Sequence, residues 1–188
     1  LVSQFTKLED FVMFCLETPL EQLDAFLSQT RKVLLKQQHL GILEQFNWVS
    51  FLRQDAQRLD IIYQHLVQTC EDLGKALPHL DDSYAIELLE KMSKRLPDLI
   101  KNADDFANVC YQLLNSHVKK TKFCDKVLSI LPSLIKNEID FRSVFFNLSD
   151  QQKTQVCDKI PTKQLCDWIK DDPSRIVDIF RCLSDRQK

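Results

Sequence analysis

Apolar residues recur along this chain with the period of an α-helix. Phe141, Val144, Phe145 and Leu148 stand at positions i, i+3, i+4 and i+7, which places them on one side of a helix. Two other segments carry the same stripe, namely Phe106, Val109, Cys110 and Leu113, and Ile176, Ile179, Phe180 and Leu183. The pattern predicts an all-α protein in which each of these helices buries one face.

The stripes belong to a longer motif that returns after 35 residues. The segment Leu96–Asn102 (LPDLIKN) recurs as Leu131–Asn137 (LPSLIKN), and each copy is followed four residues later by a phenylalanine. A third, more divergent copy contains Cys166–Lys170 (CDWIK), one residue out of phase. Because the matches include polar residues, which helical periodicity alone does not dictate, we expect tandem helical repeats.

The repeats predict how the chain is divided. We expect residues 96–188 to hold the tandem copies, and residues 1–95 to form diverged repeats or an N-terminal helical cap. The three copies are 96–130, 131–165 and a partial one at 166–188. Each is expected to contain two helices and a shorter helical piece, stacked as a solenoid or as an irregular helical bundle. Ser149–Gln152 is a capping box that begins a second helix, and Pro132 suits the first turn of a short one.

The N-terminal half repeats less clearly. Thr18–Glu21 is a second capping box, with Pro19 at the first helical position, and it predicts a helix that runs to about Gln38. One long helix is expected from about Asn47 to Asp72. Leu77–Leu80 resembles a truncated copy of the LPxL element, and its spacing to the next copy indicates that a helix is missing there.

Composition narrows the functional classes. The chain has a net charge of −2, so no global field favours a polyanion, and we expect no nucleic-acid partner. Two glycines in 188 residues argue against a Gly-rich phosphate loop. The longest apolar stretch, Phe11–Leu16, is too short to span a bilayer. No signal peptide or initiator Met is visible, so the sequence is expected to be a piece of a longer protein.

The seven cysteines are expected to be free thiols. Their number is odd, none is spaced as C-x-x-C, and most stand where an apolar residue would. Cys110, for example, occupies the repeat position of Phe145 and Phe180. This usage is typical of a reducing compartment such as the cytosol.

The repeat also carries a resemblance to a known group of proteins. The pattern LPxLIKxxxDFxxVxxxLSxxQ over residues 96–188 resembles the tandem helical repeats of Legionella secreted effector proteins. That resemblance implies a module injected into a eukaryotic cell, acting in the host cytosol and joined to further domains. It supplies no catalytic signature. The third copy departs from the pattern, since Arg175-Ile176 replaces Asp-Phe and Cys166-Asp167 replaces Leu-Pro.

No residue pattern indicates a metal or cofactor. None of the four histidines lies in a zinc-binding spacing, and no serine stands in a G-x-S-x-G motif. Paired acids such as Asp104-Asp105 precede expected helices, where they stabilise the helix N-terminus. We therefore predict no catalytic residue, no metal site and no cofactor.

Two sets of basic residues are the candidate contacts. Lys101, Lys136 and Lys170 occupy one repeat position, so stacking would align three ammonium groups; helix capping explains the same position. Lys119, Lys120 and Lys122 form a basic cluster at a helix start, read as a contact to an anionic lipid or acidic partner or as a solvated corner.

The expected function is binding without catalysis. Stacked helices expose ridges and grooves that suit a helix or an extended segment of a partner protein. The first alternative is a membrane-targeting module that binds anionic phospholipid headgroups through the lysines. A remote alternative is an all-helical enzyme domain.

Overall fold

The structure is a computed structural model that describes residues 2–170, apart from the side chains of Ser3 and of residues 168–170. Every regular element in this range is a helix, which confirms the all-α prediction. The chain divides into two compact units, Leu1–Lys91 and Met92–Lys188. None of the described helices is long and apolar enough to cross a lipid bilayer.

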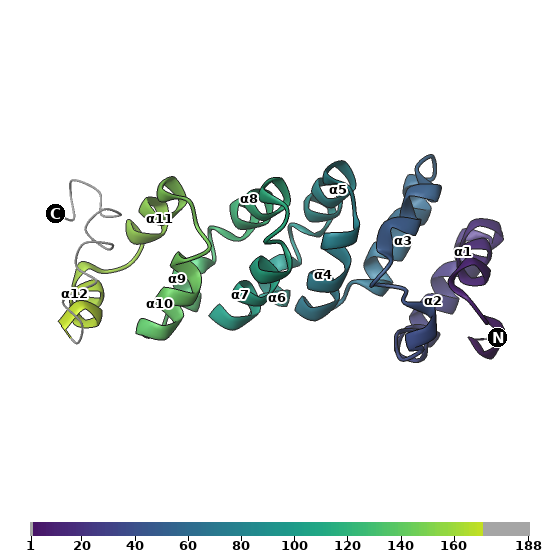
Figure 1. The fold of residues 1–188 in the computed structure, drawn as a ribbon, viewed down its shortest axis with the longest axis horizontal. Helices are drawn as coiled ribbons and strands as arrows, with labels where there is room; N and C mark the ends of the chain where they lie inside the picture. Colours follow the sequence, from purple (N-terminus) through teal and green to yellow (C-terminus); the bar gives the residue numbers. More distant parts are fainter. Residues whose placement is uncertain (1, 171–188) are drawn as a thin grey trace. The chain divides into compact units, whose positions relative to one another are not determined.

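The N-terminal unit consists of α-helices and short 3₁₀ helices (Figure 1). Its elements are η1 (Val2–Gln4), α1 (Leu8–Glu17), α2 (Leu20–Leu35), η2 (Gln38–Leu40), η3 (Phe46–Leu52), α3 (Ala56–Leu66), α4 (Cys70–Ala76), η4 (Leu77–His79) and α5 (Asp82–Met92), the last of which ends just past the unit boundary. Helix α2 packs against α3. Two polar contacts also join helices of this unit: an ion pair between Arg31 and Asp72, and a 2.7 Å contact from His65 Nε2 to Asp24.

The predicted long helix over residues 47–72 is wrong. The segment forms η3, α3 and the start of α4, because two side chains end one helix and begin the next. Asp55 accepts a hydrogen bond from the backbone N–H of Arg58, which makes it the N-cap of α3. Thr69 and Asp72 form a reciprocal capping box at the start of α4.

The predicted capping box at Thr18–Glu21 is also wrong. Thr18 is buried and closes α1, its N–H donating to the carbonyl of Phe14, and Pro19 is the N-cap residue of α2 rather than its first helical residue. Helix α2 ends at Leu35, slightly earlier than expected. Gly41 has a φ of 52°, the left-handed conformation that glycine tolerates, and it closes η2.

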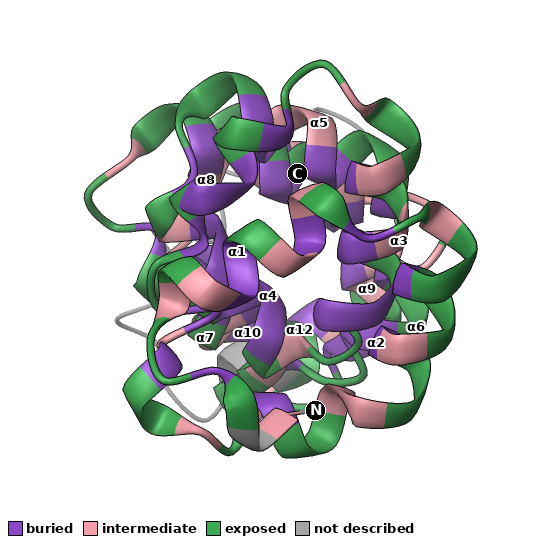
Figure 2. Cartoon of the chain, turned by 90° about the vertical axis from the view of Figure 1, so that its right-hand side faces the viewer, coloured by how far each residue is buried: buried purple, intermediate pink, exposed green. Residues whose placement is uncertain are grey.

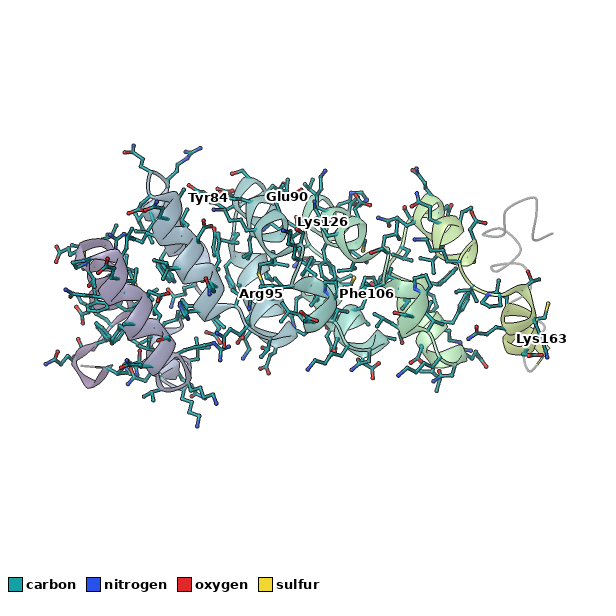
Figure 3. All side chains as sticks on the ribbon, turned by 180° about the vertical axis from the view of Figure 1, so that it is seen from behind. Tyr84, Glu90, Arg95, Phe106, Lys126 and Lys163 are labelled. Atoms are coloured by element: carbon teal, nitrogen blue, oxygen red, sulfur yellow. The ribbon has the colours of Figure 1, made fainter. Side chains whose placement is uncertain are left out.

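The C-terminal unit is built from short and longer helices in turn. They are α6 (Leu96–Leu99), α7 (Ala103–Gln112), α8 (His117–Val127), α9 (Leu131–Leu134), α10 (Glu138–Phe145), α11 (Asp150–Cys157) and α12 (Thr162–Lys170). Helix α7 packs against α10, α6 against α8 and α9 against α11. Within this unit α7 and α10 lie in one row of Figure 1, and α8 and α11 lie in a second row. Phe106 on α7 and Lys126 on α8 are labelled in Figure 3 and mark the two rows.

Two helix starts 35 residues apart have the same local structure. Asn102 and Asn137 have nearly the same backbone angles, with φ of −152° and −149°, and both are N-caps. The side chain of Asn102 accepts from the N–H of Asp105 at 2.8 Å, and that of Asn137 from the N–H of Asp140 at 2.9 Å. The apolar positions are buried in both copies: Phe106, Val109, Cys110 and Leu113 in the first, and Phe141, Val144, Phe145 and Leu148 in the second. Figure 2 shows buried and exposed residues alternating along single helices in this way.

The helix expected to be missing before Leu96 is present. Helix α5 begins and ends 35 residues before α8, and its buried Leu88 and Leu89 correspond to the buried Phe123 and Cys124. The helix before it is displaced by 33 residues rather than 35, with a buried stripe that matches the one on α7. That stripe comprises Leu73, Ala76, Leu77 and Leu80. The starts of α4 and α5 are therefore two residues closer together than those of α7 and α8, and a comparison at a constant spacing of 35 residues does not match both helices at once.

The third copy differs from the prediction where the structure describes it. Cys166–Lys170 does not form a separate four-residue helix like α6 and α9, but is the second half of α12. Ser149 and Gln152 form the predicted capping box of α11. The predicted stripe from Ile176 to Leu183 lies outside the described residues.

The described cysteines are all free thiols. Cys15, Cys110, Cys124 and Cys157 are buried, as expected for cysteines at apolar positions, whereas Cys70 is half-buried and Cys166 is exposed. Burial raises the pKa of the Cys15 thiol. Sγ of Cys110 lies 3.9 Å from Sγ of Cys124, well beyond the length of a disulfide bond.

A thiol count tests the assignment to a reducing compartment. Protein purified without reductant and denatured in the presence of a thiol reagent should titrate seven thiols, one for each cysteine in the sequence. A count of five, with a mass two hydrogens lower, would show a native disulfide and contradict that assignment.

Candidate binding surface

We call Lys101, Lys136 and Lys170 the ladder lysines, and the first two are exposed. Lys101 and Lys136 each follow a short helix and precede the N-cap of the next. No hydrogen-bond or ion-pair partner lies near either ammonium group among the described residues. The side chain of the third ladder residue, Lys170, lies outside the described part, so an aligned row of three is not shown.

The contact that repeats at these positions comes from the backbone. The N–H of Lys101 donates to Oδ2 of Asp105 at 2.9 Å, and the N–H of Lys136 donates to Oδ2 of Asp140 at 3.0 Å. A backbone donor does not depend on the identity of its side chain. The capping contact therefore explains why the aspartates recur and leaves the lysine side chains without a structural contact.

Substitutions separate the contribution of the aspartate side chains to stability from that of the lysine side chains. Asp140→Ala should lower the free energy of unfolding by about 1 kcal/mol, because an N-terminal acceptor is lost, whereas Lys136→Ala should change it by less than about 0.5 kcal/mol. Asp105→Ala and Lys101→Ala are the matched pair in the preceding copy. Urea denaturation measures all four, and a loss at the lysines equal to that at the aspartates would restore a capping role for the lysine side chains.

The basic cluster does not form one exposed face. Lys119 is only 6% exposed and lies on the buried side of α8 with Phe123. It therefore lacks the exposure that the predicted surface contact requires. Lys122 is exposed and Lys120 is half-buried. Two residues apart on a helix, they point about 160° away from each other. The predicted cluster is thus divided among three directions.

The described residues contain no candidate metal centre. No group of three or more potential metal ligands occurs among them. Two histidines make contacts typical of structural roles: His39 Nε2 lies 3.2 Å from the carbonyl of Phe5, and buried His65 contacts Asp24.

Several large apolar side chains are exposed on the C-terminal unit. Tyr111 is 69% exposed, Leu114 is 59%, Val118 is 45% and Phe146 is 84%. We call these four residues the apolar surface. Tyr111 and Phe146 are 35 residues apart and take the same position at the C-terminal ends of α7 and α10, which pack on each other. Equivalent positions on a packed pair of helices place both rings on one side of the pair.

The segments around the two rings contain no charged residue. Residues 106–116 and 143–149 are free of Asp, Glu, Lys and Arg, in a chain with 28% charged residues. Exposed polar groups there are neutral, as in Gln112 and Asn108. Exposed Arg142 stands four residues before Phe146, so one charged side chain neighbours that ring. Exposed aromatic residues are enriched at the centres of protein–protein interfaces.

Sequence reasoning missed the apolar surface because it followed the buried stripe. Tyr111 and Phe146 each stand directly after a buried residue of that stripe, Cys110 and Phe145, and a helix turns adjacent residues to different sides. The signal was present in the sequence: two aromatic residues recur at 35-residue spacing at a position that helical periodicity assigns to solvent.

Comparisons of the chain with protein family models, curated proteins and solved structures found no match.

Proposed function

We propose that this chain is a non-catalytic helical-repeat module that binds another protein through the apolar surface. The observation that supports this most directly is the pair of rings, Tyr111 and Phe146, held largely in solvent at equivalent positions of two packed helices. Exposing large aromatic side chains in water is unfavourable, and their repetition at equivalent positions is consistent with a surface covered by a partner.

The resemblance to Legionella effector repeats supports a more specific form of this proposal. In that form the partner is a host protein, and the module acts in the host cytosol after bacterial secretion. Anionic phospholipid is the alternative ligand. It is less favoured because Lys119 is buried and because Lys120 and Lys122 point in different directions.

Affinity capture with matched variants tests the proposal. The double variant Tyr111→Ser/Phe146→Ser removes both rings, and Phe51→Ser removes a ring that is 73% exposed in the N-terminal unit. All three proteins should remain folded, because substitutions of exposed residues change stability by only about 0.5 kcal/mol. We expect wild type and Phe51→Ser to capture the same protein from eukaryotic cell extract, and the double variant to lose it.

Two outcomes would contradict the proposal. Capture of the same proteins by the double variant would show that the apolar surface is not the contact. Flotation of wild type with vesicles of phosphatidylserine, with no protein captured, would favour the phospholipid alternative.

A further inference from the structure

Two cysteine thiols meet between α7 and α8. Sγ of Cys110 lies 3.9 Å from Sγ of Cys124, and both side chains are fully buried. The equivalent positions of the preceding helix pair hold two buried leucines, Leu77 and Leu89. Apolar side chains therefore satisfy the packing at these positions, and cysteine at both of them adds a thiol chemistry that leucine lacks.

The thiol pair is connected to both segments that carry the exposed rings. Cys110 immediately precedes Tyr111 in the last turn of α7. Sγ of Cys124 donates to the backbone carbonyl of Asn147 at 3.8 Å, and Asn147 follows Phe146 directly. A change in the bonding of these two sulfurs therefore acts on the backbone next to both rings.

From this arrangement we infer that Cys110 and Cys124 form a redox-sensitive link, and that closing the link weakens binding at the apolar surface. The inference rests on the proposed function and adds a regulation of the same site. The oxidant is a peroxide, because only a small molecule reaches buried thiols during a local opening of the helix pair. In the untreated protein the two thiols stay reduced and belong to the core.

The reaction with hydrogen peroxide balances in two steps. The thiolate of one cysteine attacks a peroxide oxygen, the O–O bond breaks, the sulfur becomes a sulfenic acid, and the departing hydroxide takes up the thiol proton as water. The thiolate of the second cysteine then attacks that sulfur, the S–S bond forms, and the sulfenic oxygen leaves as a second water. The two thiols lose two hydrogens and two electrons, and the peroxide takes them up.

Closing the link requires movement at the two rings. The sulfurs have to approach from 3.9 Å to about 2.05 Å, with the torsion angles of a disulfide. Cys124 also loses its S–H, and with it the hydrogen bond to the carbonyl of Asn147. Both changes act at the C-terminal ends of α7 and α10, where Tyr111 and Phe146 stand, so the oxidised chain should bind its partner more weakly.

Peptide mapping tests whether the link forms. Wild-type chain is treated with hydrogen peroxide, its remaining thiols are alkylated under denaturing conditions, and the digest is compared by mass spectrometry with and without reduction. We expect one peptide pair joined through Cys110 and Cys124, which disappears on reduction. Cys157→Ala, which removes another buried thiol of the same unit, should still give this pair, whereas Cys124→Ala should not.

The effect on binding is measured with a peptide probe. The probe is selected from a phage-displayed random library on reduced wild type, with counter-selection on Tyr111→Ser/Phe146→Ser, and its affinity is measured by fluorescence anisotropy. Oxidised wild type should bind it about tenfold more weakly, comparable to the loss of one central side chain of an interface, and should recover on reduction. Peroxide should not change the affinity of Cys124→Ala, which keeps the exposed Met13 and Cys166 and so controls for their oxidation.

The other outcomes separate the inference from the proposed function. A digest in which Cys110 and Cys124 remain unlinked after peroxide treatment would overturn the link and leave the proposed function intact. A link that leaves the affinity of the peptide unchanged would overturn the regulation, again without touching the proposed function. A selection that gives no peptide dependent on the two rings would contradict the proposed function and the regulation together.

Discussion

Phe106→Ala is expected to lower the free energy of unfolding by about 3–5 kcal/mol. The ring is fully buried and stacks on Phe123 of α8, with centroids 5.7 Å apart and planes 18° from parallel. Truncation removes a large buried apolar area and leaves a cavity between α7 and α8. Phe141→Ala, at the equivalent position of the next copy, should fall in the same range because its ring is also buried.

Phe146→Ala is the matched control for this prediction. It removes the same side chain from the same unit, but from a position in solvent, so stability should change by less than about 0.5 kcal/mol. Guanidinium chloride denaturation of the three variants compares them directly. A cost at Phe146 equal to that at Phe106 would show that the buried and exposed sides of the repeat have been assigned wrongly.

Arg58→Ala is expected to cost about 3 kcal/mol, the second largest effect. Nη1 of Arg58 donates to the carbonyls of Cys15, at 2.5 Å, and of Thr18, at 2.6 Å, at the C-terminal end of α1. Its Nε donates to Oδ2 of Asp55 at 2.9 Å. The alanine variant leaves two carbonyls without this charged donor and Asp55 without its ion pair. Arg53→Ala, at an exposed position nearby, should cost less than about 0.5 kcal/mol.

Low pH should weaken the contact between Arg58 and Asp55. The backbone N–H of Arg58, more than any other group, lowers the pKa of Asp55, and the guanidinium group adds to the shift. A carboxyl whose pKa is lower in the folded state stabilises the fold above its unfolded pKa, and loses this contribution as the pH falls through its folded pKa. The cost of Arg58→Ala, measured by denaturation across pH, should therefore shrink toward low pH. A cost that is independent of pH would show that the ion pair with Asp55 contributes nothing.

The elements that could be predicted from the sequence are those set by local signals. Ser149 and Gln152 stand three residues apart and form the predicted capping box, and Phe141 and Val144 lie on one side of a helix whatever surrounds them. The repeat at 35 residues added a second, independent signal for α7 and α10. These positions were predicted correctly because no distant contact is needed to fix them.

The remaining features depend on contacts that local patterns do not contain. Asp55 caps α3 while holding Arg58, and that arginine reaches the carbonyls of a helix 40 residues earlier, so the break in the predicted long helix depends on tertiary structure. Lys119 is buried because α8 turns this position inward, against the usual preference of lysine for solvent. The step from the start of α4 to the start of α5 is two residues shorter than that from α7 to α8, and this concealed the correspondence between the two helix pairs.

The most direct test of the binding surface is an equilibrium titration with the captured partner. Isothermal titration of purified partner should give a Kd at least about tenfold higher for Tyr111→Ser/Phe146→Ser than for wild type, as expected for two aromatic residues at the centre of an interface. The Kd for Phe51→Ser should equal that of wild type. Equal affinity for wild type and the double variant, with both proteins folded, would contradict the assignment of the apolar surface as the binding site.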